Sequence, residues 1–415
     1  MDISRREFLA TSTAATSAVV AGAAGVAAPG PPARAAEPQP STVWNSRVDP
    51  WLEIDPAALA HNVRTVARLA GGRPILAVAK NNAYGLGLRT AGPILARLPE
   101  VWGIAVVRAE EAFALHDAGV RKPILLMGPA TDDERPDLVA RSVRLAAFTD
   151  GALDEIVRAS RRTGRAAIVH FYVDTGMHRM GMPHARALPW IESLAARKEI
   201  RIEGAFTELT EDADFDREQA ARLRALAEAA RAKGLSLGRL HAASSDAVFR
   251  PNDATFLDLV RPGLAVYGGY VTDEAMARGE LRPAYRLKAR VIRVDELAPG
   301  DGVSYHRRFI ASAPTWTATL AVGHVDGYPS GAVKGCEVLI GGRLCPVIGT
   351  VSASHTVVSL GAPGASPAAK VGDEATLVGP DHPALHPNEV AKRAGWSEYN
   401  MFMHLNAGLG RRVIG

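Results

Sequence analysis

The sequence has few of the features that mark membrane, disulfide-rich or nucleic-acid-binding proteins. Only two of its 415 residues are cysteine, 6% are aromatic, and the formal net charge is +4. No basic run or stripe appears, so we expect no nucleic-acid partner. No spacing of Cys and His residues is typical of a metal site. With 47% hydrophobic and 22% charged residues, the composition is that of a globular protein with room for one large and one smaller domain.

The first 36 residues differ from the rest of the chain. They contain the pair Arg5-Arg6, a weakly apolar stretch rich in Ala, Ser and Thr, and the small-residue site Ala33-Arg34-Ala35. This order predicts a twin-arginine export signal, and hence a periplasmic or extracellular protein. The stretch is too weakly hydrophobic for a stable membrane anchor. A disordered, Ala-rich tail is the alternative. Residues 37–50 are predicted to be a linker.

The two cysteines flank a predicted hairpin. Cys336 and Cys345 lie on either side of VLIGGRL, whose turn we place at Gly341-Gly342. In a two-residue turn Cys345 faces Val338 rather than Cys336. We therefore expect two free, partly buried thiols.

Between residues 51 and 282 apolar segments alternate with segments of helical periodicity. A helix is predicted to begin after Asp55, which would cap it, with Pro56 at its first position. Eight strands are predicted, at 74–80, 101–107, 123–128, 143–149, 166–173, 201–207, 238–244 and 256–260. This count favours a (β/α)8 barrel. A doubly wound open sheet is the alternative.

From residue 283 to 415 the pattern changes to strands joined by Gly- and Pro-rich turns. Segments such as YRLKARVIRVDEL and TWTATLAVG have little helical character. The sequence therefore predicts an α/β protein, with an N-terminal (β/α)8 barrel (51–282) followed by a mostly β C-terminal domain (283–415).

A lysine follows the first predicted barrel strand, in AVAKNNAYGLG. Working residues of such barrels gather where strands end. A solvated loop charge is the plainer interpretation of Lys80, but Tyr84 and two glycines follow it. Ser244-Ser245 ends the seventh predicted strand and Arg261-Pro262-Gly263 the eighth, positions that form a recurrent phosphate site. A lysine near such a site suggests a Schiff base with a phosphorylated aldehyde.

Six segments, in order, resemble the alanine racemase family. They are AVAKNNAYGLG, VDTGMHRMG, VRPGLAVYGG, GDGVSYHRRF, AVGHVDGYPS and EYN. The resemblance covers essentially all of the chain after the predicted signal. It implies a fold-type III pyridoxal 5'-phosphate enzyme, built as a barrel plus a β domain. It also implies a head-to-tail homodimer with shared active sites.

The resemblance implies a role for each matching residue. Lys80 would bind the cofactor covalently. The phosphate of the cofactor would be held by four residues: Tyr84, Ser245, Gly263 and Tyr399.

Arg261 would face the pyridine nitrogen and keep it unprotonated, which weakens the ring as an electron sink. Arg179 would contact the cofactor's phenolic oxygen and the substrate carboxylate. Tyr305 would be the second base, contributed by the other subunit, so that Lys80 and Tyr305 serve opposite faces of the substrate. An ordinary β-domain aromatic is the alternative for Tyr305.

Several positions depart from the family pattern. Tyr172 stands where a lysine, often carbamylated, steadies the arginine, so Arg179 is expected to lack its anionic partner. Glu208 replaces a histidine that stacks on the cofactor, and Ser244 replaces an asparagine. His324 replaces a tyrosine at the entrance, and Ala353-Ser354 replaces a Met-Asp pair near the substrate. The catalytic pair is kept while the pocket wall changes.

These residues predict an amino-acid racemase acting on a small amino acid, with alanine the first choice of substrate. Four alternatives remain: a broad-specificity racemase for larger amino acids, a fold-type III decarboxylase, a Schiff-base aldolase, and a non-catalytic pyridoxal phosphate-binding protein. The decarboxylase usually needs a cysteine that no motif here supplies, and the aldolase would not need Arg261 or Tyr305.

Overall fold

A computed structural model describes residues 50–250, 253–364 and 367–415. The predicted export signal (1–36) and all but the last residue of the predicted linker lie outside the described residues. None of the described helices is long and apolar enough to cross a membrane.

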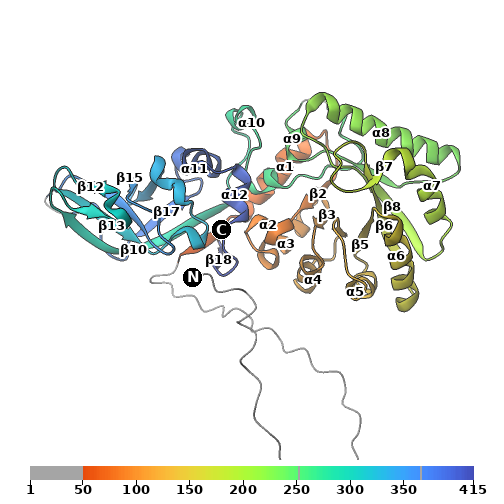
Figure 1. The fold of residues 1–415 in the computed structure, drawn as a ribbon, viewed down its shortest axis with the longest axis horizontal. Helices are drawn as coiled ribbons and strands as arrows, with labels where there is room; N and C mark the ends of the chain where they lie inside the picture. Colours follow the sequence, from red (N-terminus) through yellow and green to blue (C-terminus); the bar gives the residue numbers. More distant parts are fainter. Residues whose placement is uncertain (1–49, 251–252, 365–366) are drawn as a thin grey trace, which may run out of the picture. The chain divides into compact units, whose positions relative to one another are not determined.

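Seven parallel strands form the sheet of the first domain, in the order β2-β3-β4-β5-β6-β8-β9 (Figure 1). Their bounds are Ile75–Val78, Val101–Val106, Ile124–Leu126, Arg144–Ala147, Ala167–Asp174, Ile200–Phe206 and Arg239–His241. The two-residue strand β7 (Met182–Pro183) pairs with β6 alone. Strands β2, β4 and β6 are fully buried, whereas β8 and β9 begin with partly or fully exposed residues. Helices lie between the strands in the sequence, as the alternation predicted.

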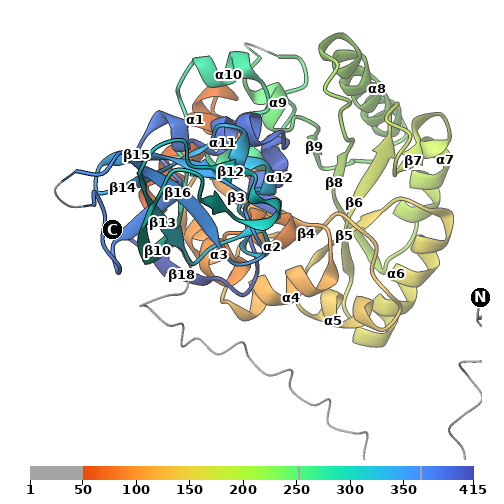
Figure 2. The same ribbon diagram turned by 60° about the vertical axis from the view of Figure 1, so that its left-hand side comes forward.

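The helices of this domain lie around the outside of the strands (Figure 2). They are α1 (Pro56–Leu69), α2 (Lys80–Tyr84), α3 (Leu88–Arg97), α4 (Ala109–Asp117), α5 (Glu134–Ala140), α6 (Asp150–Thr163), α7 (His184–Ala195), α8 (Ala213–Ala232), α9 (Ser245–Val248), α10 (Asp273–Ala277) and the 3-10 turn η1 (Leu264–Tyr267). The predicted cap of α1 is confirmed, because the Asp55 carboxylate accepts hydrogen bonds from the amides of Ala57 and Ala58.

The eighth predicted strand is reduced to single bridges that join the two edges of the sheet. Leu259 bridges to His241 on β9, and Val260 bridges to Ile75 on β2. The Val260 carbonyl accepts from the Leu76 amide at 2.9 Å. Residues 256–260 therefore connect both edges without forming a full strand, and the predicted barrel architecture is confirmed.

The second domain is an eight-stranded sheet in the order β13-β16-β15-β14-β17-β10-β1-β18. These strands are β1 (Trp51–Ile54), β10 (Tyr285–Leu297), β13 (Thr315–Leu320), β14 (Glu337–Ile340), β15 (Arg343–Ile348), β16 (Thr356–Gly361), β17 (Glu374–Val378) and β18 (Gly410–Val413). A separate pair is formed by β11 (Gly302–Val303) and β12 (Phe309–Ile310). Neighbours in the large sheet are antiparallel except β1 and β18, which are parallel.

Strand β1 belongs to this second sheet, although we placed the start of the barrel domain at residue 51. It pairs with β10 on one side and β18 on the other. The four residues of β1 are mostly apolar and would suit the sheet of either domain. Their pairing is therefore set by β10 and β18, the strands that accept β1, rather than by a pattern within β1.

The hairpin of β14 and β15 has the predicted register. Val338 faces Cys345 across it, and Gly341 and Gly342 form the turn with φ values of 56° and 81°. Cys336 and Cys345 are both buried and free, as expected. Burial raises the pKa of the Cys336 thiol to about 11, so it stays protonated at neutral pH.

Candidate active site

Lys80 begins a short turn of left-handed helix at the end of β2. The four residues after it, Asn81 to Tyr84, all have φ between 51° and 57°. Asn adopts this conformation readily, but it costs about 1–2 kcal/mol for a residue such as Ala83 or Tyr84. Backbone strain of this kind persists only where surrounding contacts impose it.

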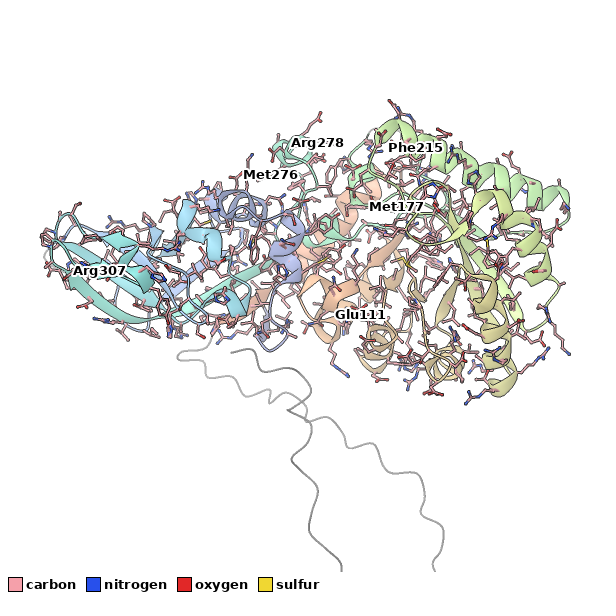
Figure 3. All side chains as sticks on the ribbon, viewed as in Figure 1. Glu111, Met177, Phe215, Met276, Arg278 and Arg307 are labelled. Atoms are coloured by element: carbon pink, nitrogen blue, oxygen red, sulfur yellow. The ribbon has the colours of Figure 1, made fainter. Side chains whose placement is uncertain are left out.

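A buried carboxylate on α4 supplies one of these contacts. Glu111, labelled in Figure 3, is 6% exposed. Its Oε1 accepts a hydrogen bond from the Asn82 amide at 3.2 Å. Its Oε2 accepts from the amides of Val107 and Arg108 at 3.1 and 3.2 Å. Glu111 thus ties the lysine turn to the end of β3.

The C-terminal segment contacts the same turn. Arg411 on β18 donates to the Gly85 carbonyl at 2.7 Å. The Asn81 amide group lies 3.1 Å from the sulfur of Met403, on α12 (Glu398–Met403). The lysine turn is therefore held from both domains.

Tyr84, Ser245 and Gly263 meet beside this turn. The Ser245 Oγ accepts hydrogen bonds from the amides of Gly263 and Ala265, at 3.0 and 3.2 Å. A Cβ at position 263 would overlap the Tyr84 hydroxyl. Burial and the nearby Tyr399 raise the pKa of Tyr84 well above its usual value, so its hydroxyl is neutral. The group places the Ser245 and Tyr84 hydroxyls around a site without a side chain, and the two amides hold the Ser245 hydroxyl in place. Hydroxyl donors grouped in this way suit a phosphate, and we call the group a phosphate cradle.

Arg261, two residues before Gly263, is buried at 3% exposure. One terminal nitrogen donates to the His241 carbonyl (2.8 Å) and to the His241 Nδ1 (3.1 Å). The other donates to the Thr207 carbonyl (2.7 Å) and the Glu208 carboxylate (3.2 Å). All four hydrogens on the terminal nitrogens of Arg261 are used. The Nε–H of Arg261 has no hydrogen-bond partner among the described residues. Arg261 therefore offers one hydrogen bond to a ligand.

A series of contacting side chains, which begins at His241, supports Arg261. Arginine has no acceptor, so His241 accepts through Nδ1 and donates through Nε2 to the Nδ1 of His170, 2.9 Å away. The His170 Nε2 then faces Glu203 at 3.5 Å, and Glu203 pairs with Arg144 at 2.7 Å. Burial holds the pKa of His241 well below its ordinary value, so it is neutral. Burial opposes ionisation of Glu203, but hydrogen bonds from His170 and Arg144 lower its pKa to about 2.

Glu208 lies between the two arginines of the site. One carboxylate oxygen is 3.2 Å from Arg261, and the other is 3.8 Å from Arg179. Tyr172 is 4% exposed and stacks on Phe206, with ring centroids 4.4 Å apart. Burial and the charge of Glu208 raise the pKa of Tyr172, so it is a neutral phenol. We expected no anionic partner for Arg179 because of Tyr172, but the structure puts a carboxylate there from Glu208.

The remaining predicted residues form a second group on loops of the β domain. Tyr305 is 72% exposed on the 3-10 turn η2 (Tyr305–Arg307). His324 and Ala353 are brought together, because the amides of His324 and Val325 donate to the carbonyls of Ser352 and Ala353. Within the described residues, no hydrogen bond, ion pair or ring contact joins this group to Lys80 or Arg261.

Sequence reasoning missed Glu111, His241 and Tyr267. Tyr267 stacks on Tyr84 at 4.8 Å and donates to the Val78 carbonyl at 3.1 Å. Its position inside VRPGLAVYGG was a usable signal, as was that of His241 just before the strand-end serines. Nothing in the sequence pointed to Glu111, whose partners are backbone amides.

Comparison with known proteins identifies the family. Residues 54–271 match the model of the alanine racemase N-terminal domain, and residues 284–413 match that of the alanine racemase C-terminal domain. The chain is 33% identical over 382 residues to an alanine racemase of Geobacter sulfurreducens, covering 87% of this chain and 95% of that protein. It is 36% identical over 338 residues to one of Mycobacterium tuberculosis, covering 79% and 86%.

Solved structures agree with the sequence comparison. The alanine racemase of D-cycloserine-producing Streptomyces lavendulae superposes with a TM-score of 0.81 at 27% identity, covering 89% of this chain and 97% of that one. An alanine racemase from Clostridium difficile 630 gives 0.79 at 26% identity, covering 86% and 94%. The matches extend over both domains, and the chain belongs to the alanine racemase family.

Proposed function

We propose that this protein is a pyridoxal phosphate-dependent alanine racemase, which interconverts L- and D-alanine. The observation that carries the proposal is the meeting of three strand ends. Lys80 follows β2, Ser245 follows β9, and Arg261 with Gly263 follows the bridges at Leu259 and Val260.

The residues present fit pyridoxal phosphate. The Ser245 and Tyr84 hydroxyls suit a phosphate, and the amides of Gly263 and Ala265 position the Ser245 hydroxyl. Tyr399 lies close enough to raise the pKa of Tyr84. The free Nε–H of Arg261 suits the ring nitrogen, and a permanently charged guanidinium leaves that nitrogen unprotonated. When bound, the cofactor withdraws electrons from the substrate and makes its α-proton acidic.

Racemisation requires a base on each face of the α-carbon. Lys80 would move the proton on one face and Tyr305 on the other. Tyr305 is exposed, and among the described residues no hydrogen bond, ion pair or ring contact joins it to Lys80 or Arg261 of its own chain. We therefore propose a homodimer in which the partner subunit contributes this tyrosine to each site.

The test is incubation of the purified protein with L-alanine in D₂O, followed by chiral chromatography. We expect D-alanine labelled with deuterium at the α-carbon. Borohydride reduction and peptide mass spectrometry should locate the cofactor on Lys80, and Lys80→Ala should abolish the visible absorption band. A cofactor-loaded protein that exchanges no α-proton would be a pyridoxal phosphate carrier, and label on another lysine would overturn the site assignment.

We also propose export through the twin-arginine pathway, supported by Arg5-Arg6 and the Ala33-Arg34-Ala35 site. Replacing both Arg5 and Arg6 by Lys should keep the uncleaved chain in the cytoplasm. An equal distribution of variant and wild type between compartments would reject this route.

A further inference from the structure

The carboxylate of Glu208 is shared between two arginines in different surroundings. Arg261 is buried, and the four hydrogen bonds that its terminal nitrogens donate fix it. The Arg179 side chain is 59% exposed, and Glu208, at 3.8 Å, is its only ion-pair partner among the described residues. The neighbouring Tyr172 is neutral and supplies no second charge. Among the described residues, Glu208 is therefore the one anion paired with Arg179, and it is shared with Arg261.

The two sides of this ion pair are held by a common set of buried contacts. The Thr175 and Thr207 hydroxyls are 2.7 Å apart and join the loop that carries Arg179 to the segment that carries Glu208. Gln219, also buried, donates to the Glu208 carbonyl at 3.0 Å. The Thr207 carbonyl is in turn fixed by Arg261. These bonds fix the backbone near Arg179 and the backbone at Glu208. A ligand that binds Arg179 therefore lies close to the Glu208 carboxylate.

We propose that Glu208 is the internal counter-ion of Arg179 and competes with the substrate's carboxylate for it. This inference rests on the proposed function, which takes Arg179 as the contact for that carboxylate. An incoming carboxylate must approach Arg179 within a few ångströms of a like charge. It therefore binds more weakly than it would to an unpaired arginine, and Glu208 acts as a positioning residue that sets the KM.

Acetate is a suitable probe, because it carries the carboxylate and nothing else that reacts. Its affinity for the cofactor-loaded protein is measured by calorimetry, without turnover. Glu208→Gln keeps the size of the side chain and removes its charge. Because the pair is partly exposed and solvent screens it, we expect acetate to bind about three- to tenfold more tightly. Glu208→Asp keeps the charge but draws it back by one methylene, and should give an intermediate affinity.

Two further variants control the experiment. Glu211→Gln removes a charge from the same loop, and Glu211 forms no ion pair among the described residues, so acetate affinity should change less than twofold. Arg179→Gln should weaken acetate binding, and adding Glu208→Gln to it should bring no further gain. Thermal unfolding and the cofactor's absorption band show whether each variant is folded and loaded.

The outcomes separate this inference from the proposed function. Unchanged or weaker acetate binding in Glu208→Gln, or an equal gain in Glu211→Gln, would overturn the counter-ion role. A gain that persists without Arg179 would also overturn it. Absence of racemisation with the Glu208 effect intact would reject the proposed function alone. Where alanine is turned over, its KM should fall with the acetate dissociation constant in Glu208→Gln.

Discussion

The hydroxyl of Tyr84 fills the space that a Cβ at Gly263 would need. These residues come from opposite ends of the barrel sequence, one after β2 and the other after the last bridge of the barrel. Their contact joins the lysine turn to the phosphate cradle, so neither can shift without the other.

Gly263→Ala should therefore weaken cofactor binding. The added methyl group displaces either the Tyr84 hydroxyl or the backbone that carries the 263 amide, at a cost of about 1–3 kcal/mol, or roughly five- to 150-fold in affinity. Pyridoxal phosphate titration of the apoprotein, followed by absorbance, measures this. Gly151→Ala on α6 is the control, because nothing lies within 4 Å of a Cβ there. Equal affinity in both variants would contradict the cradle.

Glu111→Gln should loosen the lysine turn. The amide keeps one acceptor oxygen for three backbone N–H groups, so at least one is left unpaired, at a cost of about 1–3 kcal/mol. We expect a lower melting temperature and a higher dissociation constant for the cofactor. Glu110→Gln is the matched control, because its exposed side chain pairs, within the described part of the chain, with Arg108 alone, at 3.8 Å. Identical behaviour of the two variants would show that Glu111 does not support the turn.

A mixture of two inactive variants should recover activity if the sites are shared. Lys80→Ala and Tyr305→Phe each remove one base, but a mixed dimer has one site with both. Random exchange gives intact bases in up to about one quarter of the sites. Native mass spectrometry verifies that subunits have exchanged. No recovery despite exchange would mean that each site is built within one chain.

Ala353 should widen the substrate range. Where the family has a methionine, this chain has a methyl group beside His324, so serine or a mid-sized amino acid should compete with alanine. Ala353→Met should lower kcat/KM for the larger substrate by about tenfold and leave alanine less affected. Ala362→Met, exposed beyond β16, controls for added bulk. If wild type acts on alanine alone and the methionine changes nothing, Ala353 does not line the pocket.

His386 should make stability depend on pH between about 4 and 6.5. Burial lowers its pKa to about 4 in the folded protein, below the ordinary value near 6.5. The folded state therefore resists protonation. The stabilisation is complete above pH 6.5 and is lost as the pH falls to 4, by up to about 3 kcal/mol.

The variant His386→Asn tests this dependence. Asn can still accept the hydrogen bond from the Asn388 amide at the start of α11 (Pro387–Ala394) but does not titrate. The free energy of unfolding from urea titrations should fall less steeply with pH than in wild type. Measurements at pH 8, where both residues are neutral, remove the constant effect of the substitution. Parallel curves would assign the acid sensitivity to other groups.

The sequence was informative wherever chemistry follows from position along a strand. Lys80, Ser245 and Arg261 were predicted to meet because parallel barrel strands end on one face, and the structure brings their neighbourhoods together. The residue types at those ends also indicated a phosphate cradle.

Features set by contacts between distant segments could not be predicted. The left-handed turn after Lys80 depends on Glu111 and Arg411, which no local pattern connects to it. The carboxylate of Glu208 reaches Arg179 only because β6 and β8 are neighbours and their loops are joined by Thr175 and Thr207. Substitution patterns alone suggested that Arg179 had lost its anion.

The pairing of β1 also governs how the chain is made. Its partners β10 and β18 follow it by roughly 230 and 360 residues, and ribosomes add roughly 5–20 residues per second. Trp51–Ile54 therefore waits at least about ten seconds for its first neighbour, while the whole barrel emerges between them. The barrel is an insertion within a discontinuous sheet. A fragment cut at residue 283 would leave an apolar strand unpaired on one piece and a gap inside the sheet of the other. To obtain each domain as a stable separate protein, β1 would have to be joined to the fragment that contains β10.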